Sequence, residues 1–361
     1  MEAGIFGPNN HSAFQIKWKP VWGDIRKSIG QNLLQYFDLT NIQDVSQVDE
    51  WEHNSNNFRV VCWTGVETKS FLLRKNIKIK DEQTLQSIDL VSVFLKQAGV
   101  SVPQSVHTRQ GNLYYFDGKH YWTLSEFVVG NHFCGTEKEL REVARGIGRL
   151  DRSLANLTLD LPGLEVTTWS QQEFESFFIF ASKKSDETNQ FLLSKQNVLR
   201  QIMAKNIQGR ARWIKAKVQI IHNDLHPHNT IFKDQRLRAI IDFGNMQQAP
   251  LLFDIAQALH RFVRQYVVCR GRPWAETLGI GVSIFLSEYL KENALPNDEI
   301  IAISHFMREG LLRKIATDVR KRHDRSVIPP DLTELKKLIS LLEETEPLEQ
   351  CISDFYGQQK K

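Results

Sequence analysis

The chain has little of what marks disulfide-rich, zinc-binding or membrane-spanning proteins. Four cysteines occur among its 361 residues, far apart and without a Cys-x-x-Cys pair. This spacing argues against a zinc knuckle or a disulfide framework and favours a reducing compartment. The apolar stretch at residues 281–290 is broken by two serines and Glu288, so it is too short and too polar to cross a bilayer.

A large excess of charge and a secretory signal are absent as well. The formal net charge is only +4 at pH 7, which does not by itself indicate a nucleic-acid partner. The opening residues, MEAGIFGPNN, show no basic segment followed by an apolar one, so no signal peptide is predicted. We therefore expect a cytoplasmic protein that has neither nucleic acid nor membrane as a partner. The oligomeric state is left open.

The chain is long enough, and has enough apolar residues, to form two lobes. Hydrophobic residues make up 41% of the sequence, and 361 residues exceed one small core. Short runs of strand-forming residues predict two hairpins, at 57–63 with 69–74 and at 113–116 with 121–127. Helical periodicity occurs at 22–34 and 84–97. The first third of the chain is therefore expected to be rich in β-structure.

The remainder of the chain is predicted to be mostly helical. Thr136 followed by Glu139 forms a capping-box pattern at the start of a helix that extends to about residue 157. Residues 169–205 and the chain after residue 250 also have helical character. We predict an α+β, bilobal fold with an N-terminal extension (1–35), a β-rich N-lobe (36–127) and a helical C-lobe (128–361). The boundary is expected at about residues 127–130.

The most informative stretch is residues 220–244, IIHNDLHPHNTIFKDQRLRAIIDFG. It combines His222-x-Asp224, Asn229 five residues after that aspartate, and Asp242 at the start of Asp-Phe-Gly. This is the H-x-D-x-x-x-x-N plus D-F-G arrangement of kinase-type phosphotransferases. A hairpin between Asn229 and Asp242, turning near residues 234–235, would bring these two side chains together. Mg²⁺ prefers oxygen ligands and keeps several waters, so one amide and one carboxylate suffice.

These residues therefore have predicted roles. Asp224 is the catalytic carboxylate beside the acceptor hydroxyl, and Asn229 and Asp242 are metal ligands for Mg²⁺. A purely structural interpretation makes His222 a core histidine, Asp224 a helix cap and Asp242 a turn residue. The strand–loop–strand context favours the catalytic interpretation.

The residues around Asp224 resemble the signature of one known family. Residues 222–229, HNDLHPHN, resemble the H-G-D-L-H-P-x-N signature of the aminoglycoside phosphotransferase / choline kinase-like family, with Asn223 and His228 departing from the common glycines. Residues 250–256 resemble the family's D-L-A segment, in which an aspartate, here Asp254, holds the catalytic loop; a plain helix cap is the alternative. The resemblance spans about residues 55–258. It implies a protein-kinase-like fold with ATP and Mg²⁺ as cofactors.

The resemblance also implies how the nucleotide is held. Arg74, at the end of the third strand, matches the cation that reaches the phosphates, with Lys75 as the alternative. The family pairs this cation with a helix carboxylate, and Asp89 lies near that position without matching it. No Gly-rich loop is present, so the backbone of the polar turn at Ser55 and Asn56 is a candidate phosphate contact.

Adenine is read by backbone groups at the family's hinge, which residues 122–130 resemble. Glu126 and Val128 would present those groups. The implied activity is transfer of the γ-phosphoryl of ATP to a hydroxyl of a small molecule: an amino alcohol, hydroxy amino acid, sugar or aminoglycoside. The alternatives are a protein Ser/Thr kinase with an open, basic cleft and a non-catalytic nucleotide-binding protein.

Two further features have ordinary structural interpretations. The basic residues between positions 313 and 325 are Arg313, Lys314, Arg320, Lys321, Arg322 and Arg325. Such a run is expected to be a solvated helix face, and contact with a phosphorylated or anionic partner is the alternative. A cationic acceptor would require acidic residues such as Asp318 instead. The aromatic residues Trp169, Phe174, Phe177, Phe178 and Trp274 are expected in the core.

Overall fold

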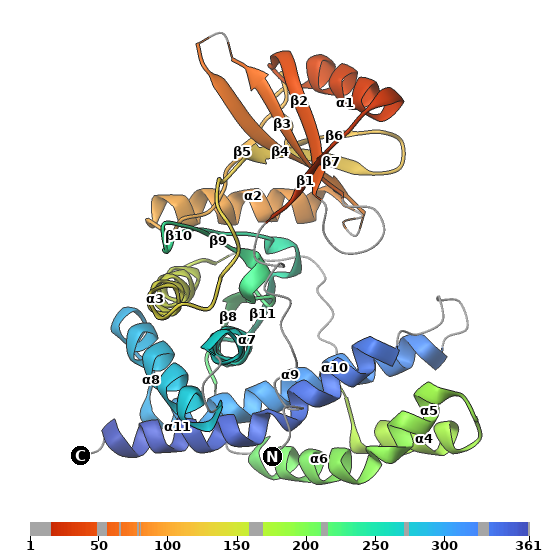
Figure 1. The fold of residues 1–361 in the computed structure, drawn as a ribbon, viewed down its shortest axis with the longest axis vertical. Coiled ribbons are helices and arrows are strands. Elements are labelled where there is room, and N and C mark those ends of the chain that lie inside the picture. The colour runs from red at the N-terminus through yellow and green to blue at the C-terminus, as the bar shows by residue number, and fades with distance from the viewer. Residues whose placement is uncertain are drawn as a thin grey trace.

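A computed structural model describes residues 16–48, 56–64, 66–77, 79, 81–158, 169–210, 216–270, 274–323 and 332–359. A β-sheet forms the N-terminal part, and helices form most of the C-terminal part (Figure 1). This is the α+β arrangement expected from the sequence. No helix in these ranges combines the length and apolarity needed to cross a membrane.

The N-terminal part is built on one antiparallel sheet. Its strands are β1 (Trp18–Pro20), β2 (Thr40–Val48), β3 (Asn57–Trp63), β4 (Thr68–Asn76), β5 (Ser105–Val106), β6 (Tyr114–Phe116) and β7 (Tyr121–Glu126). They follow the order β1-β2-β3-β4-β7-β5, and β6 pairs with β7. Both predicted hairpins, β3 with β4 and β6 with β7, are present.

The described part of residues 1–35 packs with this sheet and does not stand apart from it. Strand β1 pairs with β2, and helix α1 (Gly23–Tyr36) follows it. Ile29 and Leu33 of α1 are buried in one cluster with Val60 and Leu73 of the sheet. The helical spacing of the apolar side chains gives α1 a face to bury, which the interpretation as an extension overlooked.

Helix α2 (Glu82–Gln97) lies between the sheet and the helical part (Figure 1). It begins two residues before the predicted start at residue 84, because the Asp81 side chain accepts a hydrogen bond from the Thr84 N–H and caps the helix. Gly99, with φ +78°, follows its C-terminus.

The chain passes from β7 to helix α3 (Glu137–Leu154) alongside the segment that contains Phe232. The Asn131 N–H donates to the Phe232 carbonyl at 2.8 Å, and the Phe232 N–H donates back at 2.7 Å. A Cβ at Gly130 would lie 2.3 Å from that same Phe232 oxygen, so only glycine fits this approach. The connection is thereby fixed against the segment around Phe232.

The C-terminal part combines helices with two short strand pairs. Besides α3 the helices are α4 (Gln171–Ser182), α5 (Glu187–Ser194), α6 (Gln196–Arg210), α7 (Leu252–Arg270), α8 (Trp274–Glu292), α9 (Asn297–His323), α10 (Leu332–Glu343) and α11 (Thr345–Gln359). Strand β8 (Val218–Ile221) pairs with β11 (Gln247–Pro250), and β9 (Thr230–Lys233) pairs with β10 (Arg236–Ile240). The capping box predicted for α3 is formed by Thr136 and Glu139.

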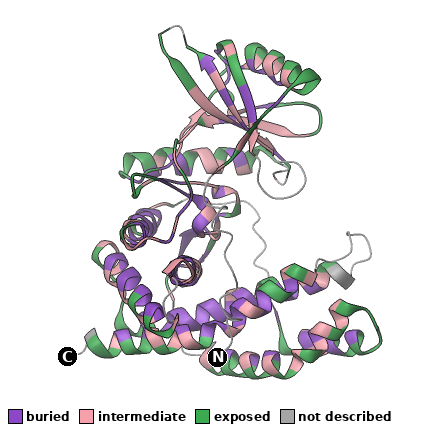
Figure 2. Ribbon diagram, in the orientation of Figure 1, coloured by how far each residue is buried: buried purple, intermediate pink, exposed green. Residues whose placement is uncertain are grey.

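Two buried clusters stabilise this part. One joins α3, α7 and α8 beneath the strand pairs, where Figure 2 shows largely buried helices. The other joins α4, α5 and α6 to α9 and α10. It contains four of the aromatic residues expected in the core: Trp169, Phe174, Phe177 and Phe178. Trp274 packs against the first cluster.

Glu288 of α8 links α8 to α3 through ion pairs. Arg141 and Arg145 donate to its carboxylate at 2.9 and 2.6 Å, and Lys291 donates at 3.0 Å. Its side chain is only 2% exposed because these partners cover it. Burial raises the pKa of Glu288, but hydrogen bonds from Arg145, Lys291 and Arg141 outweigh it and lower this pKa to about 2.

Glu288→Gln is expected to lower the free energy of unfolding at pH 7 by about 1–2 kcal/mol, because water can solvate the half-exposed arginines that it leaves behind. A depressed carboxyl pKa stabilises the fold above its unfolded value of 4.5, and that contribution is lost as the pH falls toward 2. The difference from wild type should therefore shrink between pH 7 and pH 3 in urea unfolding. Glu346→Gln, at an exposed glutamate, is the control. A difference that does not change with pH would contradict this account.

Candidate active site

The strand pair β9–β10 forms the hairpin that the sequence predicted between Asn229 and Asp242. Its turn residues, Asp234 and Gln235, have positive φ values of 54° and 59°. The Ile241 N–H donates to the Asn229 carbonyl at 3.0 Å. Asn229 and Asp242 therefore stand side by side at the open end of the hairpin, although thirteen positions separate them in sequence.

Asp224 lies at the centre of a network of amide donors. The Asn229 side-chain amide donates to the Asp224 carbonyl at 2.8 Å and to its carboxylate at 3.3 Å. Asn245 donates to the carboxylate at 3.1 Å and Gln257 at 3.2 Å. These contacts fix the orientation of the carboxylate and favour its charged form.

The charge of Asp224 is also held by nearby cations. Burial raises the pKa of Asp224, but a hydrogen bond and charge from His226, and the charges of Lys314 and His222, lower it well below its ordinary range. Asp224 is therefore ionised at neutral pH and can only accept a hydrogen bond there. A hydroxyl that approaches it must act as the donor.

Asp242 faces Arg74 across the junction between the two parts. The Arg74 Nη1 lies 2.9 Å from Asp242 Oδ1, and the Arg74 Nε donates to Asn57 at 3.0 Å. Burial raises the pKa of Asp242, but the neighbouring Arg74 charge outweighs it and holds this pKa below its ordinary value. Asp242 adopts φ 69°, a left-handed conformation that turns its side chain out of the strand direction.

Strand alternation separates Arg74 from its alternative. The Lys75 ammonium lies over the Trp122 ring, 5.6 Å from its centroid, on the other face of the sheet. Asp89 lies 3.7 Å from His107 and forms no ion pair with Arg74. The cation on the catalytic side is therefore Arg74, and its carboxylate partner is Asp242.

The other residues predicted to contact the nucleotide are only partly defined by the described part of the chain. Ser55 lies outside the described residues, and the Asn56 carbonyl accepts a hydrogen bond from the Lys75 N–H at 2.7 Å. The Glu126 N–H donates to the Gln104 carbonyl at 2.9 Å, so this N–H is already used within the protein. Val128 lies in the connection between β7 and α3.

Asp254, at the start of α7, holds the catalytic loop as the resemblance implied. Its two carboxylate oxygens accept hydrogen bonds from the backbone N–H groups of His222 and Asn223, both at 2.6 Å. Asn223 has φ 61°, which explains why asparagine can stand where the family commonly has glycine. The His222 ring is 3.0 Å from the Ile241 carbonyl and joins this loop to the hairpin. Burial raises the pKa of Asp254 to about 6, although these hydrogen bonds oppose that rise.

Asp254→Ala is expected to lower the free energy of unfolding by about 2–4 kcal/mol, because it leaves two buried backbone N–H groups without an acceptor. Asp254→Asn keeps an oxygen acceptor and should fall between Asp254→Ala and wild type. Urea unfolding of the three proteins measures the order. Equal stability of Asp254→Ala and wild type would show that Asp254 does not hold the loop.

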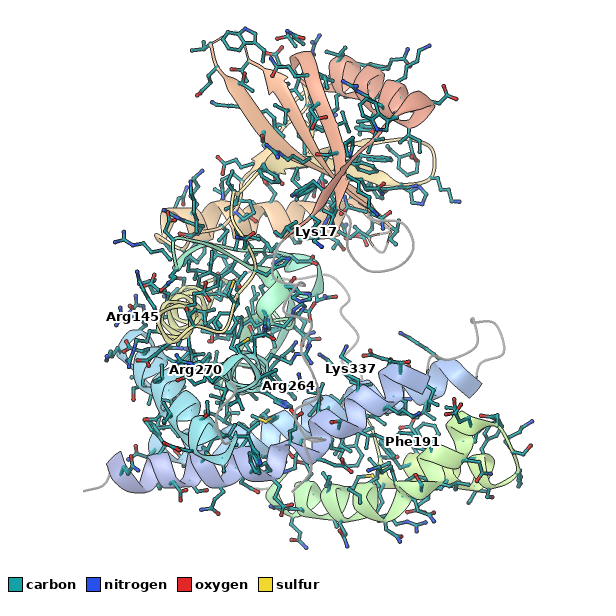
Figure 3. The ribbon with its side chains drawn as sticks, in the orientation of Figure 1. Lys17, Arg145, Phe191, Arg264, Arg270 and Lys337 are labelled. Carbon is teal, nitrogen blue, oxygen red and sulfur yellow. The ribbon has the colours of Figure 1, made fainter. Side chains whose placement is uncertain are left out.

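A cavity of about 620 Å³ opens beside Asp224. Its walls come from the catalytic loop and from α7, α9 and α10. Its lining includes several basic residues, namely His226, His260, Arg261, Arg313, Lys314, Lys321 and Lys337. Figure 3 shows Lys337 projecting from α10 toward the N-terminal part and Arg264 on the α7 side of this region.

This lining corrects the interpretation of the basic run as a solvated helix face. Arg313, Lys314 and Lys321 line the cavity, whereas Arg320 pairs with Glu173. The Arg322 side chain and all of Arg325 lie outside the described part of the chain. The missed signal was periodicity: cavity positions on α9 recur at three- and four-residue steps, which place them on one face.

The comparisons with known proteins agree with this geometry. A model described as the phosphotransferase enzyme family matches residues 51–283, well over half of the chain. The chain belongs to this family. A homoserine kinase of Azorhizobium caulinodans is 26% identical to this phosphotransferase over 66% of the chain and 71% of its own length. A homoserine kinase of Xanthobacter autotrophicus is 24% identical over 82% and 86%.

Solved structures share the fold of this phosphotransferase at low identity. The amicoumacin kinase hAmiN, in complex with AMP-PNP, Ca²⁺ and Ami, has a TM-score of 0.62 at 16% identity, covering 90% of this chain and 95% of its own. An aminoglycoside phosphotransferase from Alicyclobacillus acidocaldarius has a TM-score of 0.64 at 15% identity, covering 95% and 98%. The predicted family and kinase-like fold are confirmed, and the chain is an ATP-dependent small-molecule phosphotransferase.

Proposed function

We propose that this enzyme binds ATP·Mg²⁺ at the junction of its two parts and phosphorylates a hydroxyl held in the cavity beside Asp224. The observation that carries the proposal is the contact between Asn229 and Asp224 at the cavity wall. It joins a metal-ligand candidate to the carboxylate that faces the acceptor. We assign residues 16–127 to a nucleotide lobe and residues 128–361 to a catalytic and acceptor lobe.

The chemistry of Asn229 and Asp242 fits a magnesium ion. The Asn229 Nδ2 is engaged with Asp224, which leaves its Oδ1 as the group to face a cation. Asp242 is ionised and adjacent, and the described residues contain no cluster of three His, Cys, Asp or Glu that would form a complete metal cage. Two protein oxygens suit Mg²⁺, which takes its other ligands from water and phosphate. When bound, the ion neutralises charge on the transferring phosphoryl group.

Arg74 is proposed to contact the phosphates of ATP. Its ion pair with Asp242 keeps it on the catalytic side, and its guanidinium carries more donors than Asp242 and Asn57 use. Asp224 is proposed to accept the hydrogen bond of the acceptor hydroxyl and thereby aim the hydroxyl oxygen at the γ-phosphorus. Positioning of this kind supplies most of the catalysis in phosphoryl transfer.

For the acceptor, the homoserine kinases among the relatives make a hydroxy amino acid the first class to test. The proposal predicts ADP release that requires both Mg²⁺ and an acceptor from a panel of hydroxy amino acids, amino alcohols, sugars and aminoglycosides. A coupled assay measures it, with Asp224→Asn as the inactive reference. Acceptor-independent ADP release that is equal in wild type and Asp224→Asn would contradict the proposal.

A further inference from the structure

The cavity beside Asp224 has a basic wall. Apart from its histidines, the cations on this wall are Arg261, Arg313, Lys314, Lys321 and Lys337. The acids that line it, apart from Asp224 itself, are Asp318 and Glu334. An acceptor with several positive charges, such as an aminoglycoside, would meet repulsion on this wall.

Two of these cations are already bound within the protein. Arg313 donates to Glu309 at 2.9 Å, and its guanidinium lies over the Phe253 ring at 4.5 Å. Lys337 donates to Glu334 at 3.1 Å. These partners offset much of their charge, so neither residue needs a ligand to compensate it.

Arg261 of α7 and Lys314 of α9 are different. Within the described ranges neither forms a hydrogen bond or an ion pair. Glu344, a carboxylate whose charge acts on Arg261, is occupied by Arg264 and His260 at 3.0 Å each. Both Arg261 and Lys314 line the cavity, from facing helices.

The positive charges of Arg261 and Lys314 are close enough to repel each other. Burial lowers the pKa of the Lys314 ammonium, the charge of Arg261 lowers it further, and Asp224 only partly offsets them. Lys314 is exposed because it projects into the cavity, while protein surrounds it on its other sides. Holding two like charges in such a place is costly unless an anion binds between them.

We infer that the acceptor carries an oxyanion group, a carboxylate or a phosphate, which binds between Arg261 and Lys314 while its hydroxyl reaches Asp224. The inference rests on the proposed function of this site. The Arg261 guanidinium can hold two oxygens of such a group at once, and the Lys314 ammonium adds a point charge. The size of the cavity, about 620 Å³, leaves room for a metabolite larger than a simple amino acid.

The test uses pairs of acceptors that differ in charge. Homoserine is compared with homoserine amide, and glycerol 3-phosphate with glycerol, so that the carboxylate and phosphate forms are judged separately. Wild type is expected to prefer the anionic member of at least one pair by about tenfold or more in kcat/KM. Arg261→Gln and Lys314→Gln should each raise KM for that member about ten- to a hundredfold. The KM for ATP and the kinetics of the neutral member should change little.

A matched control is available on the neighbouring helix. Lys336 of α10 is exposed, pairs with Glu187 and does not line the cavity, so Lys336→Gln should behave as wild type. A wild-type enzyme that treats both members of each pair alike would overturn the inference. So would variants that slow anionic and neutral acceptors equally, because Arg261 and Lys314 would then act on ATP and not on the acceptor.

Direct binding separates this inference from the proposed function. Calorimetry first measures whether Mg²⁺ and AMP-PNP bind, and then titrates each acceptor pair into the protein. If nucleotide fails to bind but an anionic acceptor binds in an Arg261-dependent way, the proposed function fails and the oxyanion site stands. If nucleotide binds and neither anionic probe binds more tightly than its neutral partner, the proposed function stands and the oxyanion site is refuted.

Discussion

Asp224→Asn is expected to lower kcat by at least about two decades while leaving ATP affinity nearly unchanged. Asparagine keeps the size of the side chain but removes the charge that the acceptor hydroxyl needs, and catalysis of this kind is worth about 10²–10⁴-fold. The carboxylate has three amide donors, and the asparagine oxygen can still accept from the two that share one carboxylate oxygen, Asn229 and Asn245. Steady-state kinetics with the best acceptor, together with nucleotide calorimetry, provide the measurement.

A suitable control lies in the same segment. Asp234 is exposed at the tip of the β9–β10 turn with φ 54°, a conformation that asparagine tolerates. Asp234→Asn therefore makes the same chemical change without touching the site and should leave kcat unchanged. If Asp224→Asn turned over at the wild-type rate, Asp224 would be only a structural residue of the loop.

The proximity of the proposed site residues could be predicted from sequence because their geometry is local. Asp224, Asn229 and Asp242 lie within one strand–loop–hairpin unit, and the hairpin length decides that Asn229 meets Asp242. The choice of Arg74 over Lys75 depended on the family resemblance. The structure gives the physical reason, since alternation in β4 sends Lys75 to the Trp122 face.

The acceptor cavity could not be predicted in the same way. Its walls come from α7, α9 and α10, whose packing is fixed by tertiary contacts and not by any motif. A run of basic residues on a helix has the same sequence whether it faces water or a cavity. Which of the two it faces depends on the elements that pack against the helix. The packing of α1 against the sheet could not be predicted for a similar reason, because an apolar helix face does not reveal which sheet covers it.

Asp242→Ala is expected to abolish the Mg²⁺ dependence of nucleotide binding and to weaken binding of ATP·Mg²⁺ more than about a hundredfold. Substitution of residues that only orient metal ligands costs about 10–100-fold, and loss of a ligand should cost more. The change also releases Arg74 from its ion pair, so a second variant is needed to separate the two effects. Calorimetry with and without Mg²⁺ measures both.

Arg74→Gln provides that separation, because it breaks the ion pair and keeps the carboxylate. Nucleotide affinity should fall in this variant, since a phosphate contact is lost, yet Mg²⁺ should still tighten binding. If Asp242 acted only as a partner for Arg74, the two variants would show the same loss and the same response to Mg²⁺. Equal nucleotide affinity of wild type with and without Mg²⁺ would refute the metal assignment itself.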